Sequence, residues 1–550
     1  MKAVPLESRD MSNTIHRAEV AIAGAGLAGL CTALELLDRG RTVLLLDKDV
    51  PENVGGLARE SFGGVHLIDT PHQRRSRIHD SAELAWADWQ SYAEFGPEDR
   101  WPMAWAQRYC EASREEIFAP LDRVGIRFLP VVNWPERGML RTGNSVPRWH
   151  IVWGTGKEII VRLLAALEAH PRRKDLDLRF GHDVQGIELE TGRAAGFRGR
   201  RMDGSGEFST RTEHLVIASG GICGGDLSRL RSLWRKELGP PPEVILNGAH
   251  PFGDGQLHDR VAELGGRLTR LDRHWHYAAG VHHPAKRRPD DGLSLVPPRS
   301  ALWLNALGRR IGPPPLVSYT DTRFLVEAIL KEPGGYSWQL LNRRIAAKEL
   351  AVSGSSHMTA FVDKRRLLML KHLLFGNQAL VDRLIRECPE DFAVAATLPD
   401  LAGQMQARSL FGLRVDTEGM RQDVAAYDTE IDRGEAFLND EQLRRILAFR
   451  SYRGDRLRTC RFQKILDPKA GPLIAIREFI LARKSLGGIQ TDLGSRILGE
   501  TGSPIPGLYA VGEAAGFGGG GIHGERSLEG TFLGGCLLTG RAAGRAIAEG

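Results

Sequence analysis

The chain has 550 residues, of which 42% are hydrophobic and 26% are charged. This composition is typical of a folded globular protein and excludes intrinsic disorder, and the length corresponds to roughly three or four average domains or to two larger ones. The 74 basic and 68 acidic residues leave a net charge of +6, which is too dilute to indicate binding to nucleic acid or to a membrane.

The first predicted elements form a strand–turn–helix–strand unit. Residues 19–23 predict a buried strand, residues 27–39 predict a helix that ends at Gly40, and residues 42–47 predict a second apolar strand. This order is typical of a βαβ unit that starts a parallel sheet.

The remaining elements alternate between helical and strand patterns. Helices are predicted within 72–130 and over 156–170, a buried strand over 214–219, a proline-rich and charge-rich segment over 284–316, and a largely helical stretch over 320–450. After about residue 470 a glycine-rich strand-and-turn pattern returns. We therefore expect an α/β protein whose Rossmann-like domain is built from both chain ends, with an α+β domain inserted between them. The expected parts are a flexible N-terminal arm (1–16), the first part of the Rossmann-like domain (17–276), the inserted capping domain (277–470) and the second part of the Rossmann-like domain (471–550).

The turn after the first strand fits the dinucleotide-binding pattern GxGxxG. Gly24 permits a tight turn, Gly26 allows a pyrophosphate to approach, and Gly29 lets the helix pack closely on the strand. Asp47 follows the next strand, 23 residues after Gly24, where an acidic side chain can accept a hydrogen bond from a ribose hydroxyl. The motif does not by itself distinguish FAD from NAD.

Cysteine usage and hydropathy indicate a soluble protein in a reducing compartment, and we expect a cytoplasmic location. The six cysteines are scattered and form no CxxC pair, which excludes zinc-ribbon and thioredoxin-like sites. The apolar stretch 18–37 contains Glu19 and Glu35 and is explained by the glycine motif, so no signal peptide or membrane span is expected.

Several segments outside the first motif resemble flavoprotein fingerprints. Ile217-Ala-Ser-Gly-Gly221 is similar to the strand end at which the chain recrosses FAD, and Pro506–Gly516 is similar to the C-terminal flavin motif, which implies that Glu513 contacts the ribityl hydroxyls. Together with Ser61-Phe-Gly-Gly64, Gly253-Asp-Gly255 and Asn305-Ala-Leu-Gly-Arg-Arg310, these segments resemble the fumarate reductase/succinate dehydrogenase flavoprotein superfamily over nearly the whole chain.

Longer segments are similar to the 3-ketosteroid Δ1-dehydrogenase-like group of FAD-binding dehydrogenases. They are Arg148-Trp-His150, Trp153-Gly-Thr-Gly156, Ser485–Asp492 and the glycine-rich stretch Gly518–Gly535. The resemblance implies a Rossmann-like FAD-binding domain (GR2-type) with an inserted capping and catalytic domain. It implies these FAD-binding residues: Gly24, Gly26, Ala28, Gly29, Asp47, Lys48, Ser61, Gly63, Gly64, Gly220, Gly221, Asp254, Gly512, Glu513, Leu528 and Thr531. Non-covalent FAD is expected, because the surroundings of His66 do not match those of the covalent flavin histidines of some relatives.

The same resemblance implies an α,β-dehydrogenation of a carbonyl compound, in which a hydride passes to flavin N5 and a neighbouring carbon loses a proton. Tyr319 lies 11 residues after Gly308, close to where the ketosteroid enzymes carry a tyrosine, and is the predicted proton acceptor. The family's second tyrosine, in its C-terminal loop, is missing here, and Glu525 stands in its place. We expect a small, largely apolar carbonyl substrate.

Comparison with the fumarate reductases adds three catalytic candidates. Their dicarboxylate-binding histidine corresponds to Lys484, His523 is retained, and the arginine has shifted to Arg526. The changed arginine position argues against a dicarboxylate substrate, because bidentate clamping needs the guanidinium in place. An enoate reductase running in the opposite direction nevertheless remains an alternative.

The predicted partners follow from motifs that the chain lacks. A second GxGxxG unit, a CxxCH haem motif and an iron–sulfur cysteine cluster are absent from the sequence, so an external electron acceptor is expected, namely a quinone, another flavoprotein or oxygen. No metal site is expected from the histidines at 274–283, whose spacing does not fit zinc. An RNA-modifying flavoprotein and a non-catalytic flavin carrier are remote alternatives, and no nucleic-acid partner is expected.

Overall fold

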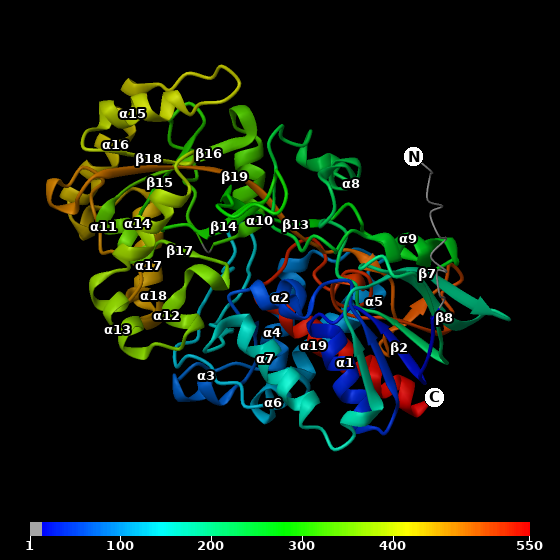
Figure 1. The fold of residues 1–550 in the computed structure, drawn as a ribbon. Coiled ribbons are helices and arrows are strands. Elements are labelled where there is room, and N and C mark those ends of the chain that lie inside the picture. The colour runs from blue at the N-terminus through cyan, green and yellow to red at the C-terminus, as the bar shows by residue number, and fades with distance from the viewer. Residues whose placement is uncertain (1–13, 319) are drawn as a thin grey trace, which may run out of the picture.

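A computed structural model describes residues 14–318 and 320–550 (Figure 1). Its core combines a mainly parallel sheet, a large mixed sheet and helices on their faces. Within the described residues, no helix is both long enough and apolar enough to cross a membrane.

The parallel sheet contains strands from both ends of the chain. Its order is β21 (Arg496–Leu498), β22 (Pro504–Ala510), β10 (His214–Ile217), β2 (Val20–Ala23), β3 (Val43–Leu46) and β6 (Leu176–Arg179), and only the β21–β22 pair is antiparallel. The residues of β2, β3 and β10 are all buried, as expected for strands covered on both faces. The predicted fold class, with both chain ends in one Rossmann-like unit, is confirmed.

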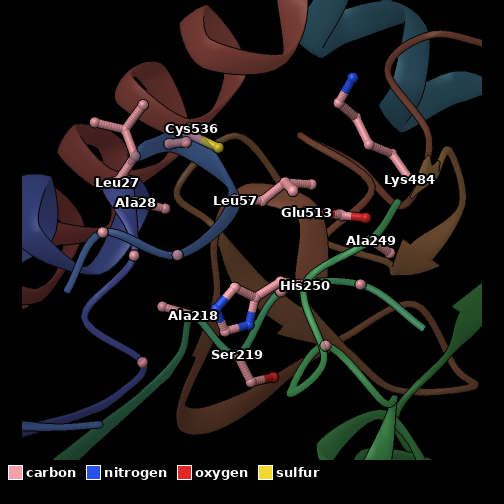
Figure 2. A pocket seen from close by; sticks show the side chains of 18 of the residues that line it. Leu27, Ala28, Leu57, Ala218, Ser219, Ala249, His250, Lys484, Glu513 and Cys536 are labelled. Atoms are coloured by element: carbon pink, nitrogen blue, oxygen red, sulfur yellow. The ribbon is translucent and has the colours of Figure 1, made fainter. Parts of the chain in front are cut away.

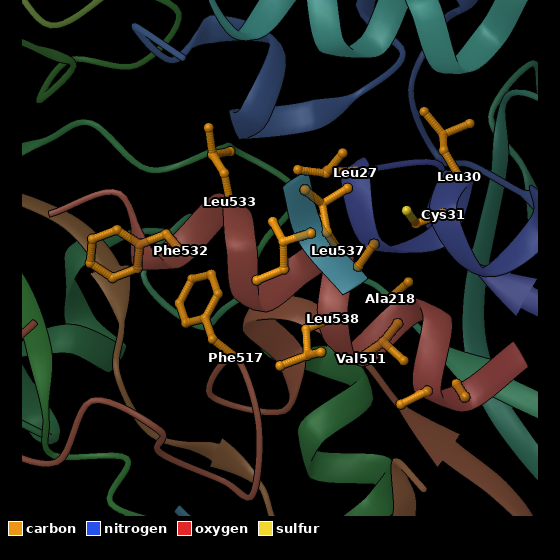
Figure 3. Packing of buried hydrophobic residues seen from close by; sticks show 14 of the residues in the cluster. Leu27, Leu30, Cys31, Ala218, Val511, Phe517, Phe532, Leu533, Leu537 and Leu538 are labelled. Atoms are coloured by element: carbon orange, nitrogen blue, oxygen red, sulfur yellow. The ribbon is translucent and has the colours of Figure 1, made fainter. Parts of the chain in front are cut away.

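One face of this sheet is covered by the first and last helices of the chain. Leu27, Leu30 and Cys31 of α1 (Leu27–Asp38) face Leu533 and other leucines of α19 (Thr531–Glu549) in a continuous apolar cluster (Figure 3). The helices approach closely at Gly540, where a Cβ would lie 2.7 Å from the carbonyl oxygen of Ala28. This packing joins the two chain ends beside the turn after β2.

A four-stranded sheet flanks the parallel sheet and includes part of the expected N-terminal arm. Its order is β1 (Thr14–Arg17), β9 (Glu207–Arg211), β8 (Arg193–Arg201) and β7 (His182–Glu190). Residues 14–16, which we expected in a flexible arm, are therefore part of a strand, because β9 offers an open edge with which β1 pairs in parallel. Residues 1–13 lie outside the described part of the chain.

The inserted region is organised around a mixed sheet with the long strand β19 (Leu473–Ser485) at its centre. The sheet order is β15 (Leu302–Asn305), β16 (Tyr336–Asn342), β19, β13 (His274–His282), β14 (Gly292–Val296) and β17 (Ala351–Val352), and β11 (Leu246–Asn247) and β18 (Phe392–Ala395) also pair with β19. The expected boundary at 276/277 falls within β13, and β19 follows the expected boundary at 470/471. Segments from both sides of the two expected boundaries therefore share this sheet.

Helices pack around both sheets. Those of the first part of the chain are α2 (Gly56–Glu60), α3 (Pro71–Arg75), α4 (Ala82–Ala93), α5 (Arg100–Ala112), α6 (Ala119–Arg123), α7 (Thr155–Glu168), α8 (Leu227–Ser232) and α9 (Gln256–Glu263). Those of the inserted region are α10 (Thr322–Leu330), α11 (Arg343–Glu349), α12 (Thr359–Val362), α13 (Arg366–Phe375), α14 (Gln378–Glu387), α15 (Leu398–Ala407), α16 (Thr417–Asp432), α17 (Glu441–Ser451) and α18 (Arg453–Arg456). Two short strand pairs, β4 (Gly64–His66) with β5 (Trp149–Ile151) and β12 (Leu268–Thr269) with β20 (Gly488–Ile489), complete the elements.

Candidate functional site

A cleft of about 1670 Å³, partly open to solvent, lies at the carboxyl ends of β2, β3 and β10 and is called the dinucleotide cleft below (Figure 2). From β2 the chain adds β3 and β6 on one side, and it later adds β10 and β22 on the other side, so the strand order changes direction at β2. Such a switch point is where open parallel sheets bind ligands. Twelve of the sixteen predicted FAD-binding residues line the cleft: Gly24, Gly26, Ala28, Asp47, Lys48, Ser61, Gly63, Gly64, Gly220, Gly221, Asp254 and Glu513.

The glycine turn after β2 has the backbone geometry that a pyrophosphate requires. Gly24 has a φ of +112°, and a Cβ at Gly29 would lie 1.9 Å from the carbonyl oxygen of Gly24. A Cβ at Gly26 would meet no protein atom within 4 Å and would project into the cleft. Gly26 is also the N-cap of α1. Because glycine has no side chain that could cap the helix, N–H groups of the first helical turn remain available to an anion.

Two charged residues after β3 line the neighbouring wall. The Asp47 carboxylate accepts hydrogen bonds from the backbone N–H groups of Ala25, at 2.6 Å, and Asp49, at 2.8 Å, which position it beside the glycine turn. Burial raises the pKa of Asp47. The Nζ of Lys48 lies 3.1 Å from Asp183 and 3.8 Å from Asp254, so its charge is balanced within the cleft wall.

The opposite wall places a buried carboxyl group in the cleft. Glu513 accepts a 2.9 Å hydrogen bond from the backbone N–H of Ser485, and burial raises the pKa of Glu513. A Cβ at Gly221 would lie 2.2 Å from Oε1 of Glu513, which explains why glycine follows β10 here. Figure 2 shows Glu513 and Lys484 on the same side of the cleft, across from Ala28.

Four predicted FAD-binding residues do not line the cleft. Gly29 packs against Gly24, and the N–H of Gly512 donates to Oγ1 of Thr539 at 2.9 Å. The Thr531 hydroxyl donates to the carbonyl of Leu528 at 2.6 Å, at the start of α19. These positions support the cleft wall from behind.

A second cavity of about 790 Å³ adjoins the dinucleotide cleft and is called the apolar cavity below. Its wall is mainly apolar and includes Ala278, Leu295, Trp303, Leu325 and Val352. The two cavities share Phe62, Trp149, Tyr277, Ser353 and Glu529. A ligand in the apolar cavity therefore lies next to a ligand in the dinucleotide cleft, and the shared residues form the boundary.

Three polar side chains meet at this boundary. The Tyr277 hydroxyl donates a 2.6 Å hydrogen bond to Oε1 of Glu529, and the Nζ of Lys484 donates to the Tyr277 oxygen at 3.2 Å. Trp275 Nε1 donates to the same Glu529 oxygen at 3.2 Å. Burial and the Glu529 carboxylate raise the pKa of Tyr277, and burial lowers the pKa of Lys484 to about 8. This arrangement can move a proton between Tyr277 and Glu529.

A β-bulge positions these groups. Trp275 of β13 pairs with Lys484 of β19, whereas His276 pairs with Ala482, so β19 carries one extra residue at this point. Bulges of this kind redirect side chains beside active sites. As a result, Lys484 lies over the ring of Phe532, with Nζ 3.8 Å from the ring centroid, and near Tyr277.

The other catalytic candidates are placed differently. Lys484 lines the dinucleotide cleft, but Tyr319 lies outside the described residues. His523 is buried, with Nε2 2.8 Å from the Thr531 hydroxyl, and burial lowers its pKa well below the usual value. Arg526 pairs with Glu94 and lies 3.7 Å from Asp321. Neither His523 nor Arg526 lines either cavity.

Tyr277 and Glu529 are not among the residues predicted from the sequence. Tyr277 stands next to the histidines of 274–276, and Glu529 stands within the C-terminal glycine-rich motif. Their contact depends on the pairing of β13 with β19 and on the turn before α19, and neither is visible as a local pattern.

The structure also groups His282, Glu390 and Asp391, which offer three ligand atoms of the kind that bind metals. Asp391 is already engaged by Arg477 at 3.1 Å and by the backbone N–H of His282 at 2.7 Å. This cluster lies outside the linings of both cavities.

Comparisons with known proteins agree with this geometry. Residues 19–533 match the family of FAD-binding domains. The chain belongs to this family. It is 40% identical to a KsdD-like steroid dehydrogenase of Mycobacterium tuberculosis (strain CDC 1551 / Oshkosh), over 97% of this chain and 96% of that protein.

Solved structures share the fold. A 3-ketosteroid Δ1-dehydrogenase from Sterolibacterium denitrificans, in complex with 1,4-androstadiene-3,17-dione, has a TM-score of 0.69 at 15% identity, covering 97% of this chain and 100% of that one. A flavocytochrome c3 fumarate reductase has a TM-score of 0.66 at 19% identity, covering 97% and 78%. The predicted membership of the fumarate reductase superfamily and its ketosteroid dehydrogenase-like group is confirmed. The protein is an FAD-dependent dehydrogenase, and the open space at Gly26 and the free end of α1 fit that cofactor.

Proposed function

We propose that this flavoprotein introduces a C=C bond next to a carbonyl group in an apolar substrate such as a 3-ketosteroid. The observation that carries this proposal is the apolar cavity, which meets the dinucleotide cleft at Tyr277 and Glu529. Its wall is mainly apolar, as in most pockets for small organic ligands. The ketosteroid and steroid dehydrogenases among its relatives support this substrate class.

The side chains at the boundary suggest how the proton is handled. FAD, when bound, accepts the hydride. Tyr277 takes the proton from the neighbouring substrate carbon and passes its own phenolic proton to Glu529, to which it is already hydrogen-bonded at 2.6 Å. The ammonium group of Lys484 stabilises the negative charge that develops around Tyr277 and Glu529.

Tyr319 is the alternative proton acceptor, on the strength of the family resemblance. It precedes Thr320 and Asp321, and the nearby residues Ser318 and Thr322 line the apolar cavity. Comparison of Tyr277→Phe with Tyr319→Phe distinguishes the two assignments.

The direct test uses purified yellow protein under anaerobic conditions. A saturated 3-ketosteroid should bleach the flavin absorbance, and the product should contain one additional C=C bond by mass spectrometry. If a panel of ketosteroids leaves the flavin oxidised while other apolar ketones bleach it, the reaction type stands and the steroid assignment is wrong. If no carbonyl compound bleaches it, the proposal fails.

The reverse reaction, reduction of an enoate, is a second candidate, because the same proton path works in both directions. A dicarboxylate is disfavoured as its substrate, since Arg526 is held by Glu94 and Asp321 and does not line the apolar cavity. Reoxidation of dithionite-reduced enzyme by an apolar enone, but not by fumarate, would support reduction of an apolar compound.

We propose non-covalent FAD, a cytoplasmic location and an external electron acceptor. His66 lines neither cavity, which supports non-covalent binding. The six free cysteines support a reducing compartment. After acid precipitation the yellow colour should remain in the supernatant, and turnover with a quinone, a flavoprotein or oxygen should identify the acceptor.

A further inference from the structure

Helix α13 exposes a row of large apolar side chains. Leu367, Leu370, Leu374 and Phe375 are 85%, 52%, 65% and 74% exposed, and none of the ten residues of the helix is buried. Leu367, Leu370 and Leu374 stand at positions i, i+3 and i+7, so they share one face. Side chains this exposed contribute little to the hydrophobic core. A patch of several exposed apolar side chains is typical of an interaction surface.

The charges around this row are mainly basic. Lys364, Arg365 and Arg366 precede the apolar side chains, and Lys371 stands among them, four residues after Leu367. All four are exposed, and the acidic side chain of this segment is Asp363. Lys364 is paired with Glu158 at 2.6 Å, which leaves Arg365, Arg366 and Lys371 to set the charge of the exposed face.

This combination of an apolar row with basic side chains fits the surface of an anionic lipid bilayer. In that setting leucine and phenylalanine enter the acyl boundary while lysine and arginine reach the phosphate groups. A second copy of the chain fits less well, because a twofold contact centred on α13 would bring Lys371, near the middle of the helix, close to its own copy.

The position of α13 gives this surface a consequence for the site. The helix lies at the edge of the inserted region beside α12, far from the parallel sheet (Figure 1). Phe361 of α12 packs on Phe62, with 5.3 Å between ring centroids, and Phe62 lines both the dinucleotide cleft and the apolar cavity. The neighbour of the exposed helix, α12, therefore contacts the wall of the apolar cavity through Phe361.

We propose that α13 docks the protein on anionic phospholipid surfaces. Docking places the apolar cavity near the bilayer, from which a poorly soluble substrate can enter it. This use of the surface rests on the proposed function, whereas the lipid binding itself does not.

The test is co-sedimentation of the FAD-loaded protein with sucrose-loaded vesicles. We expect binding to phosphatidylcholine:phosphatidylglycerol vesicles at low salt, weaker binding to pure phosphatidylcholine, and loss of the difference between them in high salt. Replacing Arg365, Arg366 and Lys371 by Gln should lower the partition coefficient on anionic vesicles by about a hundredfold, at roughly fivefold for each basic side chain. Replacing Leu367, Leu370 and Phe375 by Ser should abolish binding to both kinds of vesicle.

A matched control is Phe437→Ser, which removes a side chain of similar exposure, 68%, from another part of the inserted region. It should leave vesicle binding unchanged. Equal flavin content and equal thermal unfolding midpoints show that the variants are folded. Because vesicle binding needs no turnover, its outcome is independent of the substrate assignment.

Two results would overturn the proposal. One is the same low sedimentation with anionic vesicles for the parent protein and for both triple variants. The other is a dimer in light scattering that the serine variant dissociates, with no vesicle binding by the parent protein, which would assign α13 to contact between copies of the chain.

Discussion

The phenol of Tyr277 donates a 2.6 Å hydrogen bond to the carboxylate of Glu529, at the boundary between the dinucleotide cleft and the apolar cavity. The two residues are 252 positions apart in the chain. In the proposed reaction this contact supplies the proton acceptor.

Tyr277→Phe should slow substrate-dependent flavin reduction by about 10²–10⁴-fold without loss of FAD, because it removes the hydroxyl that receives the substrate proton. Stopped-flow absorbance under anaerobic conditions measures the rate. Tyr336→Phe is the matched control, since the Tyr336 hydroxyl contacts Ser409 and lines neither cavity. If Tyr319→Phe is slow and Tyr277→Phe reacts normally, Tyr319 is the acceptor and the Tyr277 assignment is wrong.

The rate of flavin reduction should fall as the pH rises through about 8. Burial lowers the pKa of Lys484 to that value, so the side chain is charged below pH 8 and neutral above it. The charged form stabilises the negative charge near Tyr277 and Glu529, so loss of the proton removes that stabilisation. Lys484→Gln should be slower at low pH and should no longer show the decline near pH 8. An unchanged decline in this variant would assign the titration to another group.

Gly26→Val should fold normally but lose FAD. A Cβ at Gly26 meets no protein atom within 4 Å, and the added side chain occupies the space of the pyrophosphate. Flavin content after purification and calorimetric titration with FAD measure the effect. The control is Gly403→Ala, because Gly403 also has open space around it and lies in α15. Full FAD occupancy in Gly26→Val would remove this turn from the binding site.

Arg526→Gln should affect stability more than catalysis. The guanidinium is largely buried and is held by Glu94 and Asp321. Removing it takes away the cation beside the buried Asp321 carboxylate, at a cost of up to about 3–5 kcal/mol, whereas Glu94 keeps Arg141 at 2.9 Å. Because Arg526 lines neither cavity, the rate of flavin reduction in the folded variant should stay within about threefold of the parent, far less than the effect of losing a proton-transfer group. A normal unfolding midpoint with a rate reduced 100-fold or more would instead make Arg526 catalytic, as the fumarate reductase comparison suggested.

Glu136→Gln should stabilise the protein more at pH 9 than at pH 5. Glu136 is buried in the wall of the apolar cavity, and burial raises its pKa to about 8. The folded state therefore favours the protonated carboxyl, so the parent loses stability as the pH rises from the usual glutamate pKa to about 8. Glutamine does not titrate and avoids this loss. The difference in unfolding midpoint between variant and parent should increase from pH 5 to pH 9, and a constant difference would contradict the shifted pKa.

Local sequence patterns predicted the glycine turn and the acidic residue that meet in the dinucleotide cleft. Gly24, Gly26 and Asp47 lie where the motif predicted, because a turn with a positive φ, an open approach to the backbone and an acid after the next strand are all set within one βαβ unit. Gly221 and Glu513, which the family resemblance implied, line the same cleft a few residues after β10 and β22.

The group of polar side chains at the boundary of the apolar cavity depends on the tertiary structure. Lys484, Tyr277 and Glu529 come from β19, β13 and the turn before α19, and they meet because β13 pairs with β19 across a bulge. His523 and Arg526 stand in the same C-terminal motif as Glu529, yet the glycine-rich turns direct them away from both cavities. The sequence by itself therefore determined the nucleotide-binding turn and the fold around it, because that information is local. Only the packing of distant strands decided which side chains meet at the boundary between the two cavities, because a register shift of one residue changes the direction in which each side chain points.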